Sequence, residues 1–174
     1  MNDFVLRAAQ PQDQDAIREV TLAAYAQYAD VMPAFAWNEY RKNIIETLAR
    51  VAPPVEQIVV ERAGEILGTV LLLPAGTELV APDESIHVFQ FPEVRLLAVA
   101  PSARGQGIGA ALMRECVDRA RRADAKALTL HTTDMMQTAM QMYERMGFVR
   151  APETDFFPTP EITVKGYQYA LIEN

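Results

Sequence analysis

The chain has a single cysteine, Cys116, among its 174 residues. One cysteine excludes an internal disulfide and fits a reducing compartment. No apolar run reaches the roughly 18 residues that a membrane-spanning helix needs, and the first residues, MNDFVLRAA, lack the pattern of a secretory signal peptide. We therefore expect a cytoplasmic protein with no membrane partner.

Clusters of basic residues are also missing. No run of Lys or Arg is longer than two residues, as at Arg121-Arg122, and 23 acidic residues outweigh 16 basic ones to give a formal net charge of −7. This balance argues against a nucleic-acid partner and suits a cationic substrate such as an amine better. Half of the residues are hydrophobic, which at this length predicts one globular domain over residues 1–174.

Residues 93–109, EVRLLAVAPSARGQGIG, carry the clearest functional signal in the chain. Residues 94–99 form an apolar run of strand length, three glycines follow within residues 105–109, and residues 110–123 have helical periodicity. A glycine-rich turn at a helix start can bind phosphate, because free backbone amides and the helix dipole face the ligand. The same glycines could instead form a tight turn with no ligand.

Periodicity and turn residues predict a mixed α/β (α+β) chain. Strands are expected at residues 4–7, 55–61, 66–73, 94–99, 127–131, 148–149 and 162–171, and helices at residues 11–28, 37–49, 110–123 and 135–146. Residues 62–65 have the pattern of a hairpin turn, whereas residues 74–92 and 151–160 are expected to be loops. Asp134 is the expected N-cap of the last helix, which Gly147 ends.

Two other kinds of glycine-rich loop have related patterns. A Walker-A loop needs Lys after its last glycine, and here Ile108 follows Gly107. A dinucleotide fingerprint is formally present at Gly105, Gly107 and Ala110, but residues 100–104 separate it from its strand. A nucleotide-dependent oxidoreductase therefore remains an alternative, and stabilisation by NAD(P) would mark it.

Residues 104–109 read RGQGIG, and residues 139–148 read AMQMYERMGF. Both segments resemble motifs of the GNAT-superfamily N-acetyltransferases. Residues 104–109, Arg-Gly-Gln-Gly-Ile-Gly, match the acetyl-CoA signature Arg/Gln-x-x-Gly-x-Gly/Ala. Residues 139–148 match the family's helix that ends in Tyr-x-x-x-Gly-Phe, and the two segments are spaced as in the family. One departure is Met136, at a position where many members have Asn. The element order along nearly the whole chain also matches the family.

The resemblance implies a mostly antiparallel, twisted sheet of about seven strands flanked by about four helices, in the order β-α-α-β-β-β-α-β-α-β-β. It implies an N-acetyltransferase that moves an acetyl (acyl) group from acetyl-CoA (coenzyme A) to an amine of a small molecule, amino acid or peptide. The reaction would be a direct attack through a tetrahedral intermediate, without a metal. A non-catalytic acyl-CoA-binding sensor or regulatory module of the same fold is the alternative, and a homodimer is common in the family.

The resemblance also assigns the cofactor-binding residues. Backbone groups of the central strand would pair with the pantetheine arm, and the amides of the turn would hold the pyrophosphate. These residues are Leu97, Ala98, Val99, Arg104, Gly105, Gln106, Gly107, Ile108 and Gly109. The Val99 amide would also donate to the oxyanion of the intermediate.

The catalytic acid and base follow from the same resemblance. Tyr143 stands where the family has the acid for the departing thiolate, and a phenol with an ordinary pKa of about 10 is protonated at neutral pH. Glu93 is where several members place a general base for the amine, although it could also be a solvated charge at a strand end. His87 and Glu84 are the reserve candidates. The acceptor site would be built from residues 25–40, 74–92 and 151–160, which carry no motif that identifies the amine.

Overall fold

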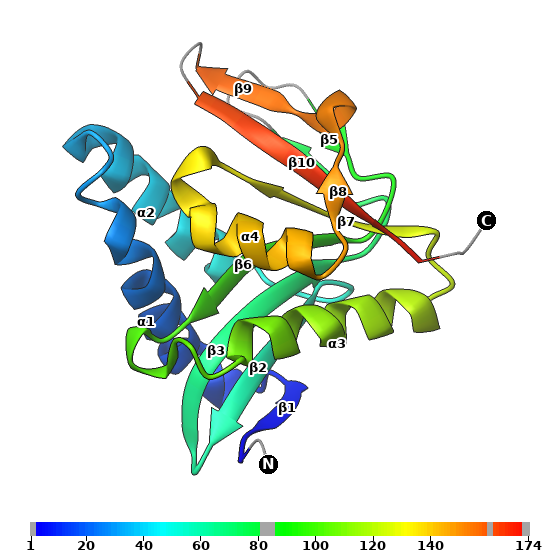
Figure 1. Ribbon diagram of the computed structural model, residues 1–174. Coiled ribbons are helices and arrows are strands. Elements are labelled where there is room, and N and C mark those ends of the chain that lie inside the picture. The colour runs from blue at the N-terminus through cyan, green and yellow to red at the C-terminus, as the bar shows by residue number, and fades with distance from the viewer. Residues whose placement is uncertain (1–2, 81–85, 160–161, 172–174) are drawn as a thin grey trace. The chain divides into compact units, whose positions relative to one another are not determined.

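The computed structural model describes residues 3–80, 86–159 and 162–171 (Figure 1). They form two compact units, which we describe separately: unit 1 is Met1–Leu72 with Leu96–Arg114, and unit 2 is Leu73–Arg95 with Glu115–Asn174. Strand β6 (Glu93–Val99) and helix α3 (Ile108–Arg122) contribute residues to both. Within the described ranges, no helix is long and apolar enough to cross a membrane.

Unit 1 is built from an antiparallel strand trio and a pair of helices (Figure 1). Strand β1 pairs with β2, and β2 pairs with β3. The turn between β2 and β3 has φ of 50° at Ala63 and 84° at Gly64, which is the pattern of a type I′ hairpin and explains its sharp reversal. The bounds in this unit are β1 Val5–Ala8, α1 Gln14–Tyr25, α2 Ala34–Ala49, β2 Glu56–Arg62 and β3 Glu65–Leu73.

Gly68 of β3 allows a close approach that fixes the start of α3. A Cβ built at Gly68 would lie 2.8 Å from Ile108 Cγ2 and 3.0 Å from the Ala98 carbonyl oxygen. Ile108 and Leu112, one helical turn apart, are fully buried. The missing side chain therefore lets α3 and β6 pack directly on β3. Both ends of the turn that joins β6 to α3 are thus held against β3.

Unit 2 is organised around the long strand β10. Strands β7, β8 and β9 each pair with β10 in antiparallel fashion, and the first residues of β6 pair with β7 in parallel. A separate two-stranded hairpin joins β4 and β5. The bounds are β4 Glu78–Val80, β5 Ile86–Val88, β7 Ala127–Thr132, α4 Gln137–Arg145, β8 Val149–Arg150, β9 Phe156–Thr159 and β10 Ile162–Ala170.

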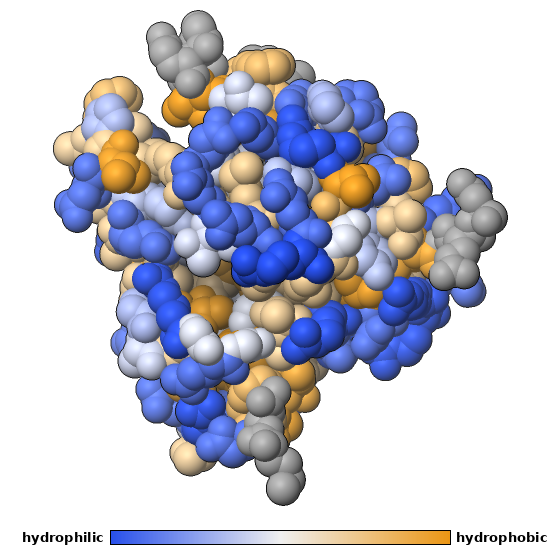
Figure 2. All heavy atoms as spheres, in the orientation of Figure 1, coloured by the Kyte–Doolittle hydropathy of each residue, from blue (hydrophilic) through white to orange (hydrophobic). Residues whose placement is uncertain are grey.

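Strand pairing follows the order β1-β2-β3-β6-β7-β10-β8, with β9 also on β10, in an eight-stranded sheet. Four α-helices accompany these strands in the described part of the chain. The predicted fold class, a mostly antiparallel mixed sheet with about seven strands and about four helices, is therefore confirmed. On the face drawn in Figure 2, hydrophilic side chains surround separate hydrophobic groups, as on ordinary water-exposed surfaces.

Several sequence-based boundaries were wrong. Residues 74–92 contain the β4–β5 hairpin instead of a plain loop, and residues 151–160 contain a short 3₁₀ turn (Pro152–Thr154) and β9. Asp134 is not the N-cap of α4, because it begins a 3₁₀ turn (Asp134–Met136) and its carboxylate pairs with Lys165. Helix α3 begins at residue 108 and not at 110, because Ile108 already packs on β3.

Candidate active site

The turn between β6 and α3 lies in unit 1 and ends in two left-handed glycines. The Ala100 amide donates to the Leu67 carbonyl at 2.8 Å, which ties the start of the turn to β3. Gly105 and Gly107 have φ of 75° and 78°, which other residues adopt only with strain. The first helical hydrogen bond of α3 runs from the Ala111 amide to the Gly107 carbonyl. The amides before Ala111 therefore have no partner within the helix, and their dipole favours an anion.

Open space surrounds both glycines. A Cβ built at Gly105 or at Gly107 would have no atom within 4 Å beyond its chain neighbours. Glycine is therefore needed here for its positive φ and not because neighbouring atoms leave no room for a side chain. A turn with this backbone, at the start of a 15-residue helix, is suited to bind an anionic group such as a phosphate.

Side chains of the turn hold it in place and leave its backbone to bind. Arg104 donates from one guanidinium nitrogen to the Ala24 carbonyl at 3.0 Å, at the C-terminal end of α1. Gln106 accepts a hydrogen bond from Arg62 at 2.9 Å and donates to the Ser102 carbonyl at 3.3 Å. The roles predicted for Arg104 and Gln106 in cofactor binding would thus fall to their backbone amides.

The second half of β6 leads into this turn. Ala98 is buried, whereas Leu97 and Val99 are half-buried, as strand alternation requires. Leu96 has φ of 49°, in the left-handed region. A leucine in this conformation interrupts the regular pleat of β6.

Glu93, the predicted base, lies in unit 2 and is buried. Its side chain is 2% exposed, so the alternative of a solvated strand-end charge is wrong. Oε2 accepts a hydrogen bond from the Thr129 hydroxyl at 2.5 Å, and Oε1 lies 2.6 Å from Nδ1 of His131. The parallel register sets Glu93 opposite Thr129, and Thr129 and His131 share one face of β7 because side chains alternate along a strand.

His131 is held at both ring nitrogens. Nε2 lies 3.0 Å from the Thr154 carbonyl oxygen, which can only accept, so Nε2 carries a proton. A second proton lies between Nδ1 and Glu93. Burial lowers the pKa of His131, but the hydrogen bond and charge of Glu93 and the Thr154 carbonyl outweigh it, and the net pKa is raised above 6.5. These contacts hold the ring with Nε2 toward the Thr154 carbonyl and Nδ1 toward Glu93.

Tyr143, the predicted acid, is fixed at the C-terminal end of α4. The Phe148 amide donates to the Tyr143 carbonyl at 3.0 Å, the Gly147 amide donates to Glu144 at 3.0 Å, and Gly147 has φ of 98°. These are the two bonds of a Schellman motif. The rings of Tyr143 and Phe148 lie 6.0 Å apart, and Tyr143 is 7% exposed. The sequence pattern Tyr-x-x-x-Gly-Phe therefore corresponds to a helix that ends in a Schellman motif.

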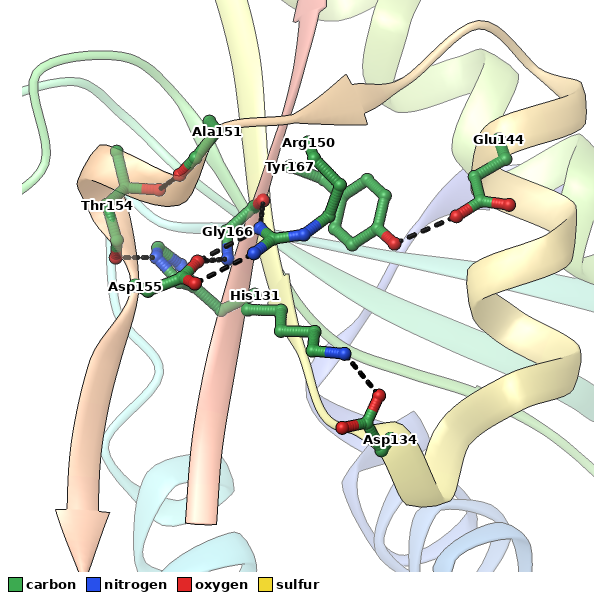
Figure 3. A network of polar contacts seen from close by, with 10 residues as sticks. His131, Asp134, Glu144, Arg150, Ala151, Thr154, Asp155, Gly166 and Tyr167 are labelled. Carbon is green, nitrogen blue, oxygen red and sulfur yellow. Dashed lines mark hydrogen bonds and ion pairs between the residues drawn. The ribbon is translucent and has the colours of Figure 1, made fainter. Parts of the chain in front are cut away.

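A polar network holds the segment that carries the Thr154 carbonyl (Figure 3). Thr154 donates to the Ala151 carbonyl from its amide at 2.9 Å and from its hydroxyl at 2.8 Å. Asp155 accepts two hydrogen bonds from Arg150, at 2.9 and 2.7 Å, and a third from the Gly166 amide at 2.8 Å. The hydrogen bond from Arg150 is the main reason why the pKa of Asp155 is lowered.

The reserve candidates are less well placed. His87 is exposed on β5, with its ring 6.4 Å from that of His131, and Glu84 lies outside the described residues. In the described part of the chain, no three His, Cys, Asp or Glu side chains are grouped to hold a metal ion. Thr129 and His131 were not predicted from the sequence. Their spacing of two residues within the strand predicted at residues 127–131 was the available signal.

The chain matches the Acetyltransferase (GNAT) family over residues 17–148. It is 30% identical over 117 residues to an IAA acetyltransferase from Azospirillum brasilense, covering 67% of this chain and 68% of the relative. A GNAT family acetyltransferase from Brucella melitensis, solved in complex with acetyl-CoA, has a TM-score of 0.62 at 23% identity over 100% of this chain and 92% of its own. A GNAT family acetyltransferase from Staphylococcus aureus has a TM-score of 0.68 at 14% identity over 97% and 99% of the two chains. The chain belongs to the GNAT acetyltransferase family.

Proposed function

We propose that this protein is a cytoplasmic, acetyl-CoA-dependent N-acetyltransferase whose acceptor is an amine of a small molecule, amino acid or peptide. The observation that carries the proposal is the turn with left-handed Gly105 and Gly107 directly before α3. Bound acetyl-CoA would supply an acetyl group activated as a thioester. The net charge of −7 suits a cationic amine, and the single, buried Cys116 fits a reducing compartment.

Binding of the CoA arm is assigned to the second half of β6 and the turn. The amides of residues 104–109 would hold the pyrophosphate, and the backbone of Leu97 and Val99 would pair with the pantetheine like an added strand. The Val99 amide would then donate a hydrogen bond to the carbonyl oxygen as negative charge develops on it.

Two proton transfers complete the proposal. Tyr143 would give its phenolic proton to the departing thiolate as the C–S bond breaks. Glu93 would receive the proton that the amine loses, directly or through water, as the new C–N bond forms. An ordinary alkyl ammonium has a pKa of about 10, so a base is needed at neutral pH.

The decisive experiment measures release of the CoA thiol from acetyl-CoA over a panel of amines. Turnover with at least one amine supports the proposal. Stabilisation by acetyl-CoA without turnover on any amine would favour the sensor alternative, and stabilisation by NAD(P) alone would favour an oxidoreductase.

Once an acceptor is known, two variants test the assigned roles. Tyr143→Phe should lower kcat by about 10²- to 10⁴-fold with little change in acetyl-CoA affinity. Glu93→Gln should lower kcat about 10²-fold at neutral pH, and the deficit should shrink as pH approaches the pKa of the amine. A wild-type kcat in either variant would remove that residue from the mechanism.

A further inference from the structure

We propose that His131 is a positioning residue for Glu93: a doubly protonated imidazolium that keeps the buried carboxylate ionised and correctly oriented. The inference deepens the proposed function and rests on it for the role of Glu93 as the base. The proton state of the pair, however, follows from contacts within unit 2 alone.

Burial makes a positive partner necessary for Glu93. Its side chain is 2% exposed, so bulk water solvates a negative charge there poorly, and the His131 side chain beside it is 12% exposed. A buried carboxylate is stable only when it is paired and hydrogen-bonded. Both of its oxygens have partners, namely His131 at Oε1 and Thr129 at Oε2.

The imidazole ring is fixed from its far side as well. Nε2 donates to the Thr154 carbonyl, and Thr154 packs so closely on β10 that a Cβ at Gly166 would lie 1.7 Å from its hydroxyl oxygen. The adjacent Asp155 is held by Arg150 and by the Gly166 amide (Figure 3). The ring therefore cannot turn to offer a free nitrogen while Thr154 stays in place.

Thr129 allows Glu93 to take up a proton while His131 keeps both of its own. The Thr129 hydroxyl lies 2.5 Å from Glu93 Oε2 and 3.1 Å from the Pro92 carbonyl oxygen. It donates to Oε2 when the carboxylate is ionised. When Oε2 holds a proton, the hydroxyl accepts from it and turns to donate to Pro92. One proton is added in this step, and no buried polar atom loses its partner.

Among the described residues, four ionisable groups lie around His131. Glu93 and Arg95 come from β6, His87 comes from β5 with its ring 6.4 Å away, and Asp155 follows the Thr154 carbonyl. Glu93 raises the pKa of His131, whereas Arg95 lowers it. Of these four side chains, Glu93 is the one hydrogen-bonded to the ring, so its charge should dominate.

The first test is ¹⁵N NMR of the histidine side chains in the whole protein, which has only two histidines. His87→Gln leaves one signal and so assigns His131. We expect both nitrogens of His131 to be protonated at pH 7, above the ordinary imidazole pKa of about 6.5. In Glu93→Gln the amide oxygen can still accept but has no charge, so His131 should lose its second proton at lower pH. A singly protonated His131 at pH 7 in the wild type would overturn the inference.

The second test is the pH profile of kcat/KM with an amine found in the panel. His131→Gln keeps a hydrogen-bond donor but loses the charge, so the acid limb should move to higher pH by about 1 to 3 units. A His131→Gln profile that is lowered at every pH with an unmoved limb would mean a merely structural role and would overturn the inference.

The two proposals can fail separately. If no amine is acetylated, or if Glu93→Gln keeps the wild-type rate, the proposed function or its base assignment fails. The NMR measurement still decides the proton state of His131 in that case, because it needs neither turnover nor a known acceptor.

Discussion

Replacing Gly107 by alanine tests the backbone conformation of the turn without introducing a steric clash. The added methyl meets no atom within 4 Å, so no steric clash opposes it. It does penalise φ of 78°, by about 1–2 kcal/mol for an L-residue in the left-handed region. The chain can relieve this strain by rotating the turn, which would redirect the amides that we assign to the pyrophosphate. We therefore expect a folded protein that binds acetyl-CoA poorly.

The expected shifts in melting temperature are measurable. Acetyl-CoA at a hundred times its Kd should stabilise the wild type by about 2.7 kcal/mol, which raises Tm by about 5–11 °C at roughly 2–4 °C per kcal/mol. A hundredfold loss of affinity at the same ligand concentration leaves about 0.4 kcal/mol, a shift of about 1–2 °C.

Gly76→Ala is the matched control, because Gly76 has φ of 83° and equally open surroundings but lies outside the turn. Without ligand, the Tm of both variants should fall by about 2–8 °C. Only Gly107→Ala should also lose the rise in Tm that acetyl-CoA causes. The measurement is differential scanning fluorimetry with and without acetyl-CoA. A full shift in Gly107→Ala would show that the phosphates bind elsewhere.

Features that depend on short stretches of chain could be predicted from the sequence. The turn at Gly64 and the helix end at Gly147 were both expected because glycine tolerates positive φ. The strand and helix of residues 93–123 were expected from hydrophobic periodicity, and the turn between them from its glycines. In each case a local backbone requirement selects the residue, so the pattern can be read without knowing the rest of the fold.

The contact between Glu93 and His131 could not be predicted in the same way. The two residues lie 38 positions apart and meet only because β6 and β7 pair in one register. A shift of one residue would turn His131 to the other face of the sheet. Asp134 failed as a predicted N-cap for a related reason, because Lys165, from a distant strand, takes its carboxylate. Long-range pairing thus decided both the burial of Glu93 and the local chemistry of Asp134.

Two further substitutions test the packing of each unit. Gly68→Ala should lower the free energy of unfolding in urea by about 1–3 kcal/mol, because its methyl would meet Ile108 at 2.8 Å and backbone at 3.0 Å; an unchanged value would contradict this close approach. Asp155→Asn tests acid stability, since the hydrogen bond from Arg150 lowers the pKa of Asp155 below 3.8. A depressed folded-state pKa gives stability that is present above 3.8 and lost as pH falls through the folded value. The variant should therefore be less stable than the wild type by about 1.5–3 kcal/mol at pH 7, and the gap should close at acid pH. A gap that stays constant from pH 7 to acid conditions would mean that Asp155 stabilises unit 2 through its shape and not through its charge.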